Sequence, residues 1–283
     1  YYLARLPEFR RFAESRMEGT SGRQRVAWQS LLSYEIKYPT GSERSRIGDF
    51  LSKLDDKIEI NRKMSETLEG MAQALFKSWF VDFDPVIDNA LEAGNSIPEE
   101  LTERAEIRNK VLADGTTNRE VARQFPDSFQ LNEEMGLIPE GWELKQIKEL
   151  CEVVCGKTPS KKNTDYYGKD VPFIKIPDMH NCVWVTETTD NLSFEGANSQ
   201  QKKEIPPNSI CVSCIATVGK VIITSTHSHT NQQINSVIPN HHALIYYLYF
   251  TFSSMGKLFE DLASGGSATL NLNTGNFSKI EII

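Results

Sequence analysis

The sequence predicts an α+β protein that combines one long coiled-coil helix with a domain made of a small, twisted, mainly antiparallel sheet and helices. Two patterns predict this class: a heptad repeat of apolar residues in the first third of the chain, and strand-like runs with a period of two after residue 137. A third observation, an internal repeat, indicates that the end of a similar domain occurs twice in the chain.

The heptad pattern runs from Ile47 to about Phe80. Its apolar positions alternate in steps of three and four residues, and charged residues fill most of the other positions, as in a coiled coil. The predicted helix-pairing seam consists of Ile47, Leu51, Leu54, Ile58, Asn61, Leu68 and Leu75. A helix of about 34 residues is about 50 Å long, which is too long for a small domain to bury. We therefore expect the seam to face another helix; an amphipathic core helix is the alternative.

The helix pattern breaks at Asp82-Phe83-Asp84-Pro85, so we assign residues 47–85 to a spacer helix. The acidic residues 86–136 contain Pro98 and Pro126 and only short helical patterns, such as 99–112. We expect this stretch to be a connector of marginal structure.

A second domain is predicted over residues 137–283, where the period changes toward two. The expected strands are 171–176, 181–186, 209–217, 220–224 and 233–238, with a hairpin turning near Val218-Gly219. Residues 241–262 are expected to form a helix that ends before Gly265-Gly266.

The internal repeat links the two ends of the chain. Tyr1-Tyr2-Leu3 recurs as Tyr246-Tyr247-Leu248 at an offset of 245, Gly19-x-Ser21-x4-Val26 recurs as Gly265-x-Ser267-x4-Leu272 at 246, and Ile36 recurs as Ile282 at 246. Each copy passes from an aromatic helix through a Gly/Ser turn to a short apolar strand. Residues 1–46 are therefore expected to be the C-terminal tail of a first domain, and a second long helix is expected after Ile283.

The net charge of −7 is unevenly distributed. Residues 1–46 carry nine Lys and Arg against five Asp and Glu, whereas residues 47–136 carry ten against nineteen. Phosphate contact needs local positive charge and not a basic whole protein, so composition leaves DNA binding open. No apolar run approaches the roughly 20 residues that span a bilayer, so we expect no membrane partner.

Catalytic chemistry is not indicated. The five cysteines lie among strand-like apolar residues, which favours reduced thiols and a cytoplasmic protein. The alternative is a zinc site of Cys151 and Cys155 with Cys211 and Cys214. Gly156-Lys157-Thr158 resembles the end of a phosphate-binding loop, but Cys151 stands where its first glycine would be. We expect no catalytic residue, no metal and no cofactor.

Base edges in DNA are read by polar side chains on loops, and phosphates are bound by Lys, Arg and backbone amides. Three loops of the second domain and one turn of the first-domain tail supply such groups. The candidates are Lys157, Ser160, Lys161, Lys162, Asn163, Tyr166 and Tyr167; Asn231 and Gln232; Ser267, Thr269 and Asn271; and Arg23, Gln24 and Arg25. The structural alternatives for the three loops are a solvated surface loop, a structural turn and a helix-terminating turn.

Residues 51–86, LSKLDDKIEINRKMSETLEGMAQALFKSWFVDFDPV, resemble very closely the central conserved region of type I restriction-modification specificity subunits. The resemblance rests on Leu54-Asp55-x-Lys57-Ile58, Asn61-Arg62, Leu68-Glu69 and FKSWFVDFDP at 76–85. In the second domain, Pro139-x-Gly141-Trp142-Glu143, Gly156-Lys157-Thr158-Pro159, Thr217-x-Gly219 and Thr230-Asn231-Gln232 occur in the order expected of a target recognition domain. Residues 9–26 resemble the end of a preceding recognition domain.

The resemblance implies two recognition domains held apart by two antiparallel helices, each domain reading half of a bipartite target in double-stranded DNA. It also implies docking of methyltransferase subunits and, through the complex, of the restriction subunit. We therefore expect a non-catalytic, sequence-specific DNA-binding subunit. A fragment of a fused restriction-modification enzyme and a coiled-coil assembly module are the alternatives. Because the sequence holds one long helix, its exposed seam also predicts a homodimer through that helix.

Overall fold

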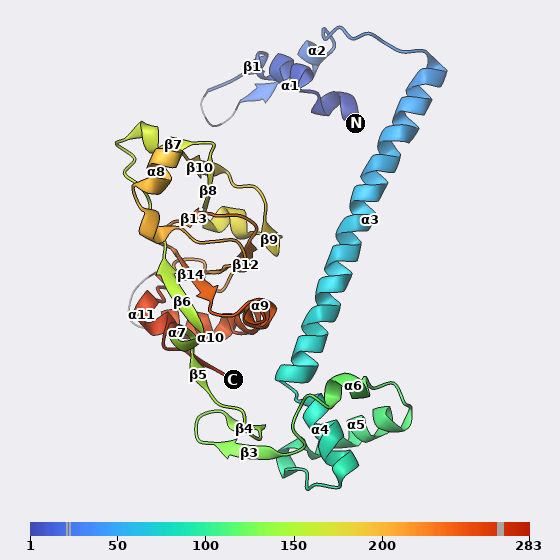
Figure 1. Cartoon of the computed structure of the whole chain (residues 1–283). Helices are drawn as coiled ribbons and strands as arrows, with labels where there is room; N and C mark the ends of the chain where they lie inside the picture. Colours follow the sequence, from blue (N-terminus) through green and yellow to red (C-terminus); the bar gives the residue numbers. More distant parts are fainter. Residues whose placement is uncertain (21, 23, 265–268) are drawn as a thin grey trace. The chain divides into compact units, whose positions relative to one another are not determined.

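The computed structural model describes residues 1–20, 22, 24–264 and 269–283 (Figure 1). The chain divides into two compact units, Tyr1–Leu68 and Glu69–Ile283, and the long helix α3, Gly41–Phe80, runs through the boundary between them. Over the described residues, we find no helix with the length and apolar character required to span a membrane.

The first unit is small and has no fully buried residue among those described. Before α3 it contains η1 Tyr2–Arg5, α1 Pro7–Glu14, the hairpin strands β1 Met17–Glu18 and β2 Arg25–Val26, and α2 Trp28–Leu31. Phe9 and Phe12 pack against Tyr34, with ring centroids 5.1 and 5.0 Å apart. Tyr2 donates a hydrogen bond to Asp55 on α3 at 2.8 Å. An aromatic cluster therefore organises this unit in place of a buried core.

The long helix begins six residues before the predicted Ile47 because a capping box precedes it. Thr40 donates through its backbone N and its Oγ1 to Glu43 Oε2, at 2.8 and 2.7 Å, and satisfies part of the helix start. Along α3 the apolar seam faces outward: Ile47, Leu54, Ile58, Leu68 and Leu75 are each about half exposed. The seam is thus available for pairing, which stays a prediction.

The last turns of α3 pack against the helix α9, Leu244–Ser254. Tyr249 donates a hydrogen bond to Glu69 Oε1 at 2.9 Å, and the ring of Phe76 lies 5.7 Å from that of Phe250. Phe80 also contacts Tyr247, with ring centroids 5.3 Å apart. Aromatic packing therefore fixes this end of the spacer helix to the second domain.

Residues 86–136 correct the expectation of marginal structure. They hold most of α4 Asp84–Ala93, then η2 Glu99–Leu101, α5 Thr102–Ala113, α6 Arg119–Ala122 and the hairpin of β3 Phe129–Asn132 with β4 Gly136–Pro139. The short helices around Val86, Ile87 and Ala90, which are fully buried, form a unit that we call the helical subdomain, residues 84–125. The turn into it is sharp, since Phe83 adopts a left-handed φ of 52°.

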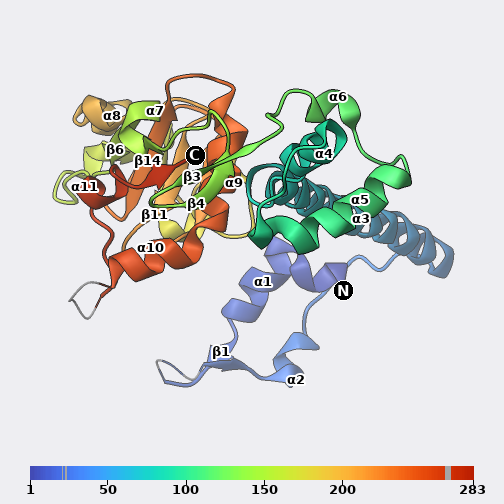
Figure 2. The same ribbon diagram turned by 90° about the horizontal axis from the view of Figure 1, so that it is seen from below.

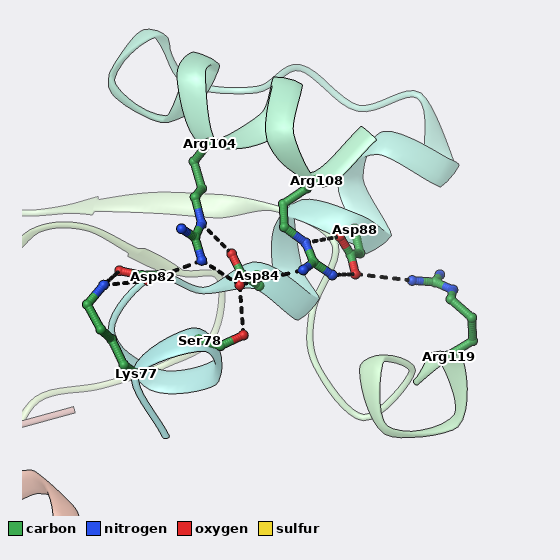
Figure 3. Close-up of polar contacts among 8 residues, drawn as sticks. All are labelled: Lys77, Ser78, Asp82, Asp84, Asp88, Arg104, Arg108 and Arg119. Carbon is green, nitrogen blue, oxygen red and sulfur yellow. Dashed lines mark hydrogen bonds and ion pairs between the residues drawn. The ribbon is translucent and has the colours of Figure 1, made fainter. Parts of the chain in front are cut away.

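Paired charges hold this subdomain together (Figure 3). Asp84 and Asp88 on α4 are almost fully buried. Arg104 donates from Nε and Nη2 to the two oxygens of Asp84, both at 2.7 Å, and Arg108 Nε donates to Asp88 at 2.8 Å. Arg119 lies 3.9 Å from Asp88. The expectation failed because each carboxylate finds its arginine 20 residues away, which a count of acidic residues does not show.

Two larger sheets form most of the second domain. The five-stranded sheet has the order β6-β14-β11-β12-β9, and the four-stranded sheet has the order β13-β8-β10-β7. Their bounds are β6 Cys151–Cys155, β7 Tyr167–Gly168, β8 Val171–Ile174, β9 Trp184–Val185, β10 Asp190–Leu192, β11 Ile210–Ser213, β12 Val221–Thr224, β13 His229–Thr230 and β14 Ile234–Pro239. The β12–β9 and β13–β8 pairs are parallel and the other pairs are antiparallel, which confirms the predicted class.

Helices cover one face of the five-stranded sheet. Figure 2 shows α9, α10 Gly256–Ala263 and α11 Thr274–Phe277 gathered around β11 and β14. Ile210 and Val212 of β11 join their core, whereas Cys211 between them packs in a second core on the opposite face. This alternation follows from the period of two in a strand. The remaining short elements are β5 Lys145–Gln146, paired with β15 Glu281–Ile282, and α7 Ile147–Leu150, η3 Thr164–Tyr166, η4 Ile176–Met179, α8 Phe194–Asn198 and η5 Gln201–Lys203.

The predicted strands and hairpin are present, but several elements are shorter. The β11–β12 hairpin turns at Gly219, whose φ is 86°. The single helix expected over 241–262 is split at Met255 into α9 and α10. A Cβ on Gly219 would lie 3.2 Å from the Cα of Gly256, so the break brings the hairpin turn close to the start of α10.

Candidate nucleic-acid interface

Three chain segments meet the five-stranded sheet at the same end: those after β6 and β11 and the one before β14. The strand β6 ends at Cys155, which pairs with Asn235 near the start of β14. The strand β11 ends at Ser213, which pairs with Ile234, the first residue of β14. Because these strands are antiparallel, the segments after β6 and β11 and before β14 emerge together. The sheet register therefore brings the predicted loops 157–167 and 231–233 to one edge.

Direct hydrogen bonds join these two loops. Thr158 Oγ1 donates to Gln232 Oε1 at 2.7 Å, and the backbone N of Lys157 donates to the carbonyl of Thr230 at 2.9 Å. Gly156 lies against the second loop so closely that a Cβ there would be 2.2 Å from the carbonyl oxygen of Asn231. Residues 156–160 and 230–233 thus form one surface, which we call the recognition edge.

The two amide residues on the recognition edge have different environments. Asn231 is only 7% exposed, and its side chain is held by Gln233: Oδ1 accepts from the Gln233 backbone N at 3.1 Å and Nδ2 donates to Gln233 Oε1 at 3.0 Å. This arrangement favours a structural turn at Asn231. Gln232 is exposed, and Thr158 fixes its amide by donating to Oε1. Gln232 is therefore the amide that the edge presents to a ligand.

The rest of the first loop is a folded excursion with exposed lysines. Asn163 caps η3 by accepting from the backbone N of Asp165 at 3.1 Å. Tyr167 donates to the carbonyl of Pro159 at 2.9 Å, while Tyr166 is half-buried. Ser160, Lys161 and Lys162 lie exposed at the surface of the loop. The aromatic residues and Asn163 shape the loop, and the lysines supply its positive charge.

The described end of the third predicted loop, residues 269–272, is joined to the recognition edge through Cys214. The backbone N of Cys214 donates to the carbonyl of Gln233, and the backbone N of Leu272 donates to the carbonyl of Cys214, both at 2.8 Å. Thr269 and Asn271 are exposed next to this connection. The predicted Ser267 lies outside the described residues, as does Arg23 of the first-domain tail. In the first unit, Gln24 and Arg25 are exposed on the β1–β2 hairpin.

Sequence reasoning missed two buried polar residues behind the recognition edge. Gln200 is 7% exposed and donates from Nε2 to the carbonyl of Lys157 at 3.0 Å. Its Nε2 also lies 3.4 Å from Nδ1 of His229, which is fully buried. Burial lowers the pKa of the His229 imidazole. Gln200 lies in the polar run Ser199-Gln-Gln-Lys-Lys203, where no periodic signal marks a buried side chain.

The cysteines do not converge on one point. Cys151 and Cys155 lie at opposite ends of β6, opposite Pro239 and Asn235. Burial raises the pKa of Cys211 to about 12 and that of Cys214 to about 11, so both thiols are poorly suited to bind a metal as thiolates. Across the described ranges of the chain, no cluster of three or more His, Cys, Asp and Glu is arranged to hold a metal ion.

Comparison with known proteins gives consistent descriptions. Residues 139–283 match the family model of the type I restriction modification DNA specificity domain. The specificity subunit of the type I restriction enzyme HindI from Haemophilus influenzae is 49% identical over 300 residues, which cover 97% of this chain and 64% of that protein. The MjaIX specificity subunit from Methanocaldococcus jannaschii is 30% identical over 153 residues, 53% of this chain and 35% of that protein. The chain thus spans less than two thirds of the length of either relative.

Solved structures similar to this chain include the HsdS subunit from Thermoanaerobacter tengcongensis, with a TM-score of 0.41, 15% identity, and coverage of 97% of this chain and 57% of that one. A chain from a study of complex assembly and conformational transition of the type I R-M system has a TM-score of 0.40 and 17% identity, and the match covers 100% of this chain and 57% of that one.

Proposed function

The chain belongs to the type I restriction modification DNA specificity family, and from this premise we propose that it reads a DNA sequence for the other subunits of such a system. The observation that carries the proposal is the recognition edge, where Lys157, Thr158 and Gln232 meet at the exposed end of a rigid sheet. Polar side chains on loops that a stable scaffold positions are suited to read base edges.

Different residues of the recognition edge and its loops are suited to base contacts, to phosphate contacts and to loop shape. A glutamine amide pairs in two places with adenine in the major groove, and Thr158 holds the Gln232 amide in one orientation before DNA arrives. Lys157, Lys161 and Lys162 are exposed and supply charge for phosphate contacts. Asn163, Tyr166 and Tyr167 would then act through loop shape, whereas Ser160, Thr269 and Asn271 remain candidate base contacts.

We further propose that the chain is non-catalytic and docks methyltransferase subunits, and that the restriction subunit joins through the assembled complex. The names of the relatives support this assignment, since both are specificity subunits of restriction enzymes. No cofactor is assigned to this chain. The same proposal places it in the cytoplasm, where reducing conditions keep thiols such as Cys211 and Cys214 unpaired.

The proposed domain organisation treats residues 1–46 as the tail of a first recognition domain, 47–85 as the spacer helix and 137–283 as the second recognition domain, with 86–136 between them. The repeat supports it in structure as well as in sequence. The short helices α2, Trp28–Leu31, and α11, Thr274–Phe277, are separated by 246 residues, the same offset that relates Ile36 to Ile282.

The exposed seam of α3 supports a homodimer as a further part of the proposal. A row of half-exposed Leu and Ile side chains on one helix face is stabilised when a second helix covers it. We expect the chain to self-associate at tens of micromolar in sedimentation equilibrium, and Leu54→Asp with Ile58→Asp to abolish this. A strict monomer for the parent chain would contradict the pairing.

The proposed function is tested by selection from random duplex DNA, with the chain assembled with its cognate methyltransferase subunit. We expect enrichment of a short motif, alone or as half of a gapped site. Gln232→Ala should relax the preference at one position of that motif, whereas Lys161→Ala should weaken binding to all sequences alike. An assembled complex that enriches no sequence and binds no duplex at low salt would refute DNA reading and favour an assembly module.

A further inference from the structure

One short segment braces the first loop of the recognition edge at both of its ends. Near the far end, the backbone N of Ser193 donates to the carbonyl of Tyr166 at 3.1 Å, and a Cβ on Gly196 would lie 2.0 Å from that same oxygen. At the near end, Gln200 donates to the carbonyl of Lys157 at 3.0 Å. Residues 193–200, which we call the bracing segment, therefore hold loop 157–167 where it leaves and where it rejoins the sheets.

The peptide groups around Lys157 are fixed from two independent directions. The backbone N of Lys157 donates to the carbonyl of Thr230, on β13, while its carbonyl accepts from Gln200 of the bracing segment. Neither partner is close to Lys157 in sequence, so the local chain does not determine this conformation. The backbone at Lys157 is thus held by both Thr230 and Gln200.

Neighbouring acceptors fix the orientation of the Gln200 amide. Its Nε2 faces two atoms that can accept, the carbonyl oxygen of Lys157 and Nδ1 of His229. A flipped amide would place Oε1 against the carbonyl oxygen of Lys157 and lose that hydrogen bond. The imidazole accepts at Nδ1 only in its neutral form with the proton on Nε2, which agrees with its burial.

This arrangement is unfavourable for stability alone. Oε1 of Gln200 and Nε2 of His229 are buried without a hydrogen-bond partner among the described residues. A buried unsatisfied polar atom typically costs about 1–3 kcal/mol, whereas Nε2 of the same amide satisfies the carbonyl of Lys157. Buried unsatisfied polar groups are rare in folded proteins and each needs a specific explanation.

We propose that Gln200 is a positioning residue for DNA reading: it clamps the carbonyl of Lys157 and so fixes the conformation in which Lys157 and Thr158 face the DNA. This inference rests on the proposed function. Gln200 itself is too buried to touch DNA, so its effect passes through Lys157. The ligand of the recognition edge in this proposal is duplex DNA, whose bases and phosphates need hydrogen-bond donors at fixed places.

The clamp is tested first without DNA, by hydrogen exchange on the parent chain and on Gln200→Met, which keeps the volume but cannot donate. We expect the backbone amide of Lys157, which donates to the carbonyl of Thr230, to exchange about 3- to 10-fold faster in the variant, the change for one lost hydrogen bond. Gln201→Met, at the exposed neighbouring glutamine, is the matched control. Unchanged exchange at the Lys157 amide would overturn the clamp whatever the outcome of DNA selection.

Binding to the selected DNA motif then tests the role in reading. We expect Gln200→Met to weaken specific binding about 3- to 10-fold, and to do so less when Lys157→Met is already present, because part of the effect passes through the Lys157 side chain. If Gln200→Met folds poorly, Gln200→Asn takes its place in both measurements, because its side chain is too short to reach the carbonyl of Lys157. If Gln200→Met weakens binding equally in the parent chain and in Lys157→Met, and lowers Tm in both, Gln200 has a structural role only. If the parent chain selects no motif, the proposed function fails, and exchange alone decides the clamp.

Discussion

Removing Arg108 should destabilise the helical subdomain far more than the loss of a surface arginine. The side chain of Arg108 is 16% exposed and that of Asp88 is 2% exposed, so the two charges face each other largely outside water. In Arg108→Ala, Nη1 of Arg119, at 3.9 Å, is the one cationic partner that Asp88 keeps among the described residues. A buried carboxylate that loses its partner typically costs about 3–5 kcal/mol. We expect a loss of that size in the free energy of unfolding.

Urea denaturation followed by tryptophan fluorescence measures this loss, because Trp79 and Trp142 both pack against Phe125 of the subdomain. Arg123→Ala, at an exposed arginine of the same subdomain, is the matched control and should change stability by less than about 0.5 kcal/mol. The double variant Asp88→Leu with Arg108→Met should recover most of the loss, since it removes both charges. A cost below about 1 kcal/mol for Arg108→Ala, the range of a solvated pair, would refute the reasoning.

Three further predictions concern the second domain and the spacer helix. Gly156→Ala places a Cβ against backbone and should destabilise the fold by about 1–3 kcal/mol. Gly70→Ala, in open space on α3, should instead stabilise it by about 0.5–1 kcal/mol. The midpoints of urea denaturation distinguish the two outcomes. Burial lowers the folded-state pKa of His229 below its usual 6.5. The contribution of the neutral imidazole to stability is therefore complete above about pH 6.5 and is lost as the pH falls through the folded-state value. The parent chain should lose more stability on acidification than a His229→Gln variant, and equal losses would contradict this. Replacing Lys161 and Lys162 by alanine should reduce the salt dependence of DNA affinity by up to about 0.9 per lysine in the log–log slope, and an unchanged slope would remove both from the phosphate contacts.

The parts of the fold that were predicted from sequence are those in which periodicity reports directly on a buried face. Ile210 and Val212 face one core and Cys211 the other, and this alternation is visible in the sequence itself. The long helix was found in the same way, although its start was placed too late. The capping box formed by Thr40 and Glu43 was present in the sequence and marks the true start.

The parts that were missed depend on partners far away in the chain. The sequence marks loops 157–167 and 231–233 separately, but only the sheet register shows that Thr158 bonds to Gln232, 74 residues later. Gln200 is polar in a polar run, and nothing local shows that it is buried under Lys157. A count of charges records Asp84 only as one negative residue, because its partner Arg104 lies on another helix, α5.

The same pairing reconciles the net charge of −7 with the DNA reading that we propose for the recognition edge. The guanidinium groups of Arg104, Arg108 and Arg119 are turned toward buried carboxylates and add little to the field outside the subdomain. Its exposed surface is left to glutamates, among them Glu99, Glu100, Glu103 and Glu106. Among the described residues, the exposed Lys157, Lys161 and Lys162 form no ion pair with a carboxylate. In the proposed function, phosphates would therefore be repelled by the subdomain and attracted to the recognition edge. Acidic composition in the middle of the chain is therefore compatible with the proposed DNA binding at the recognition edge.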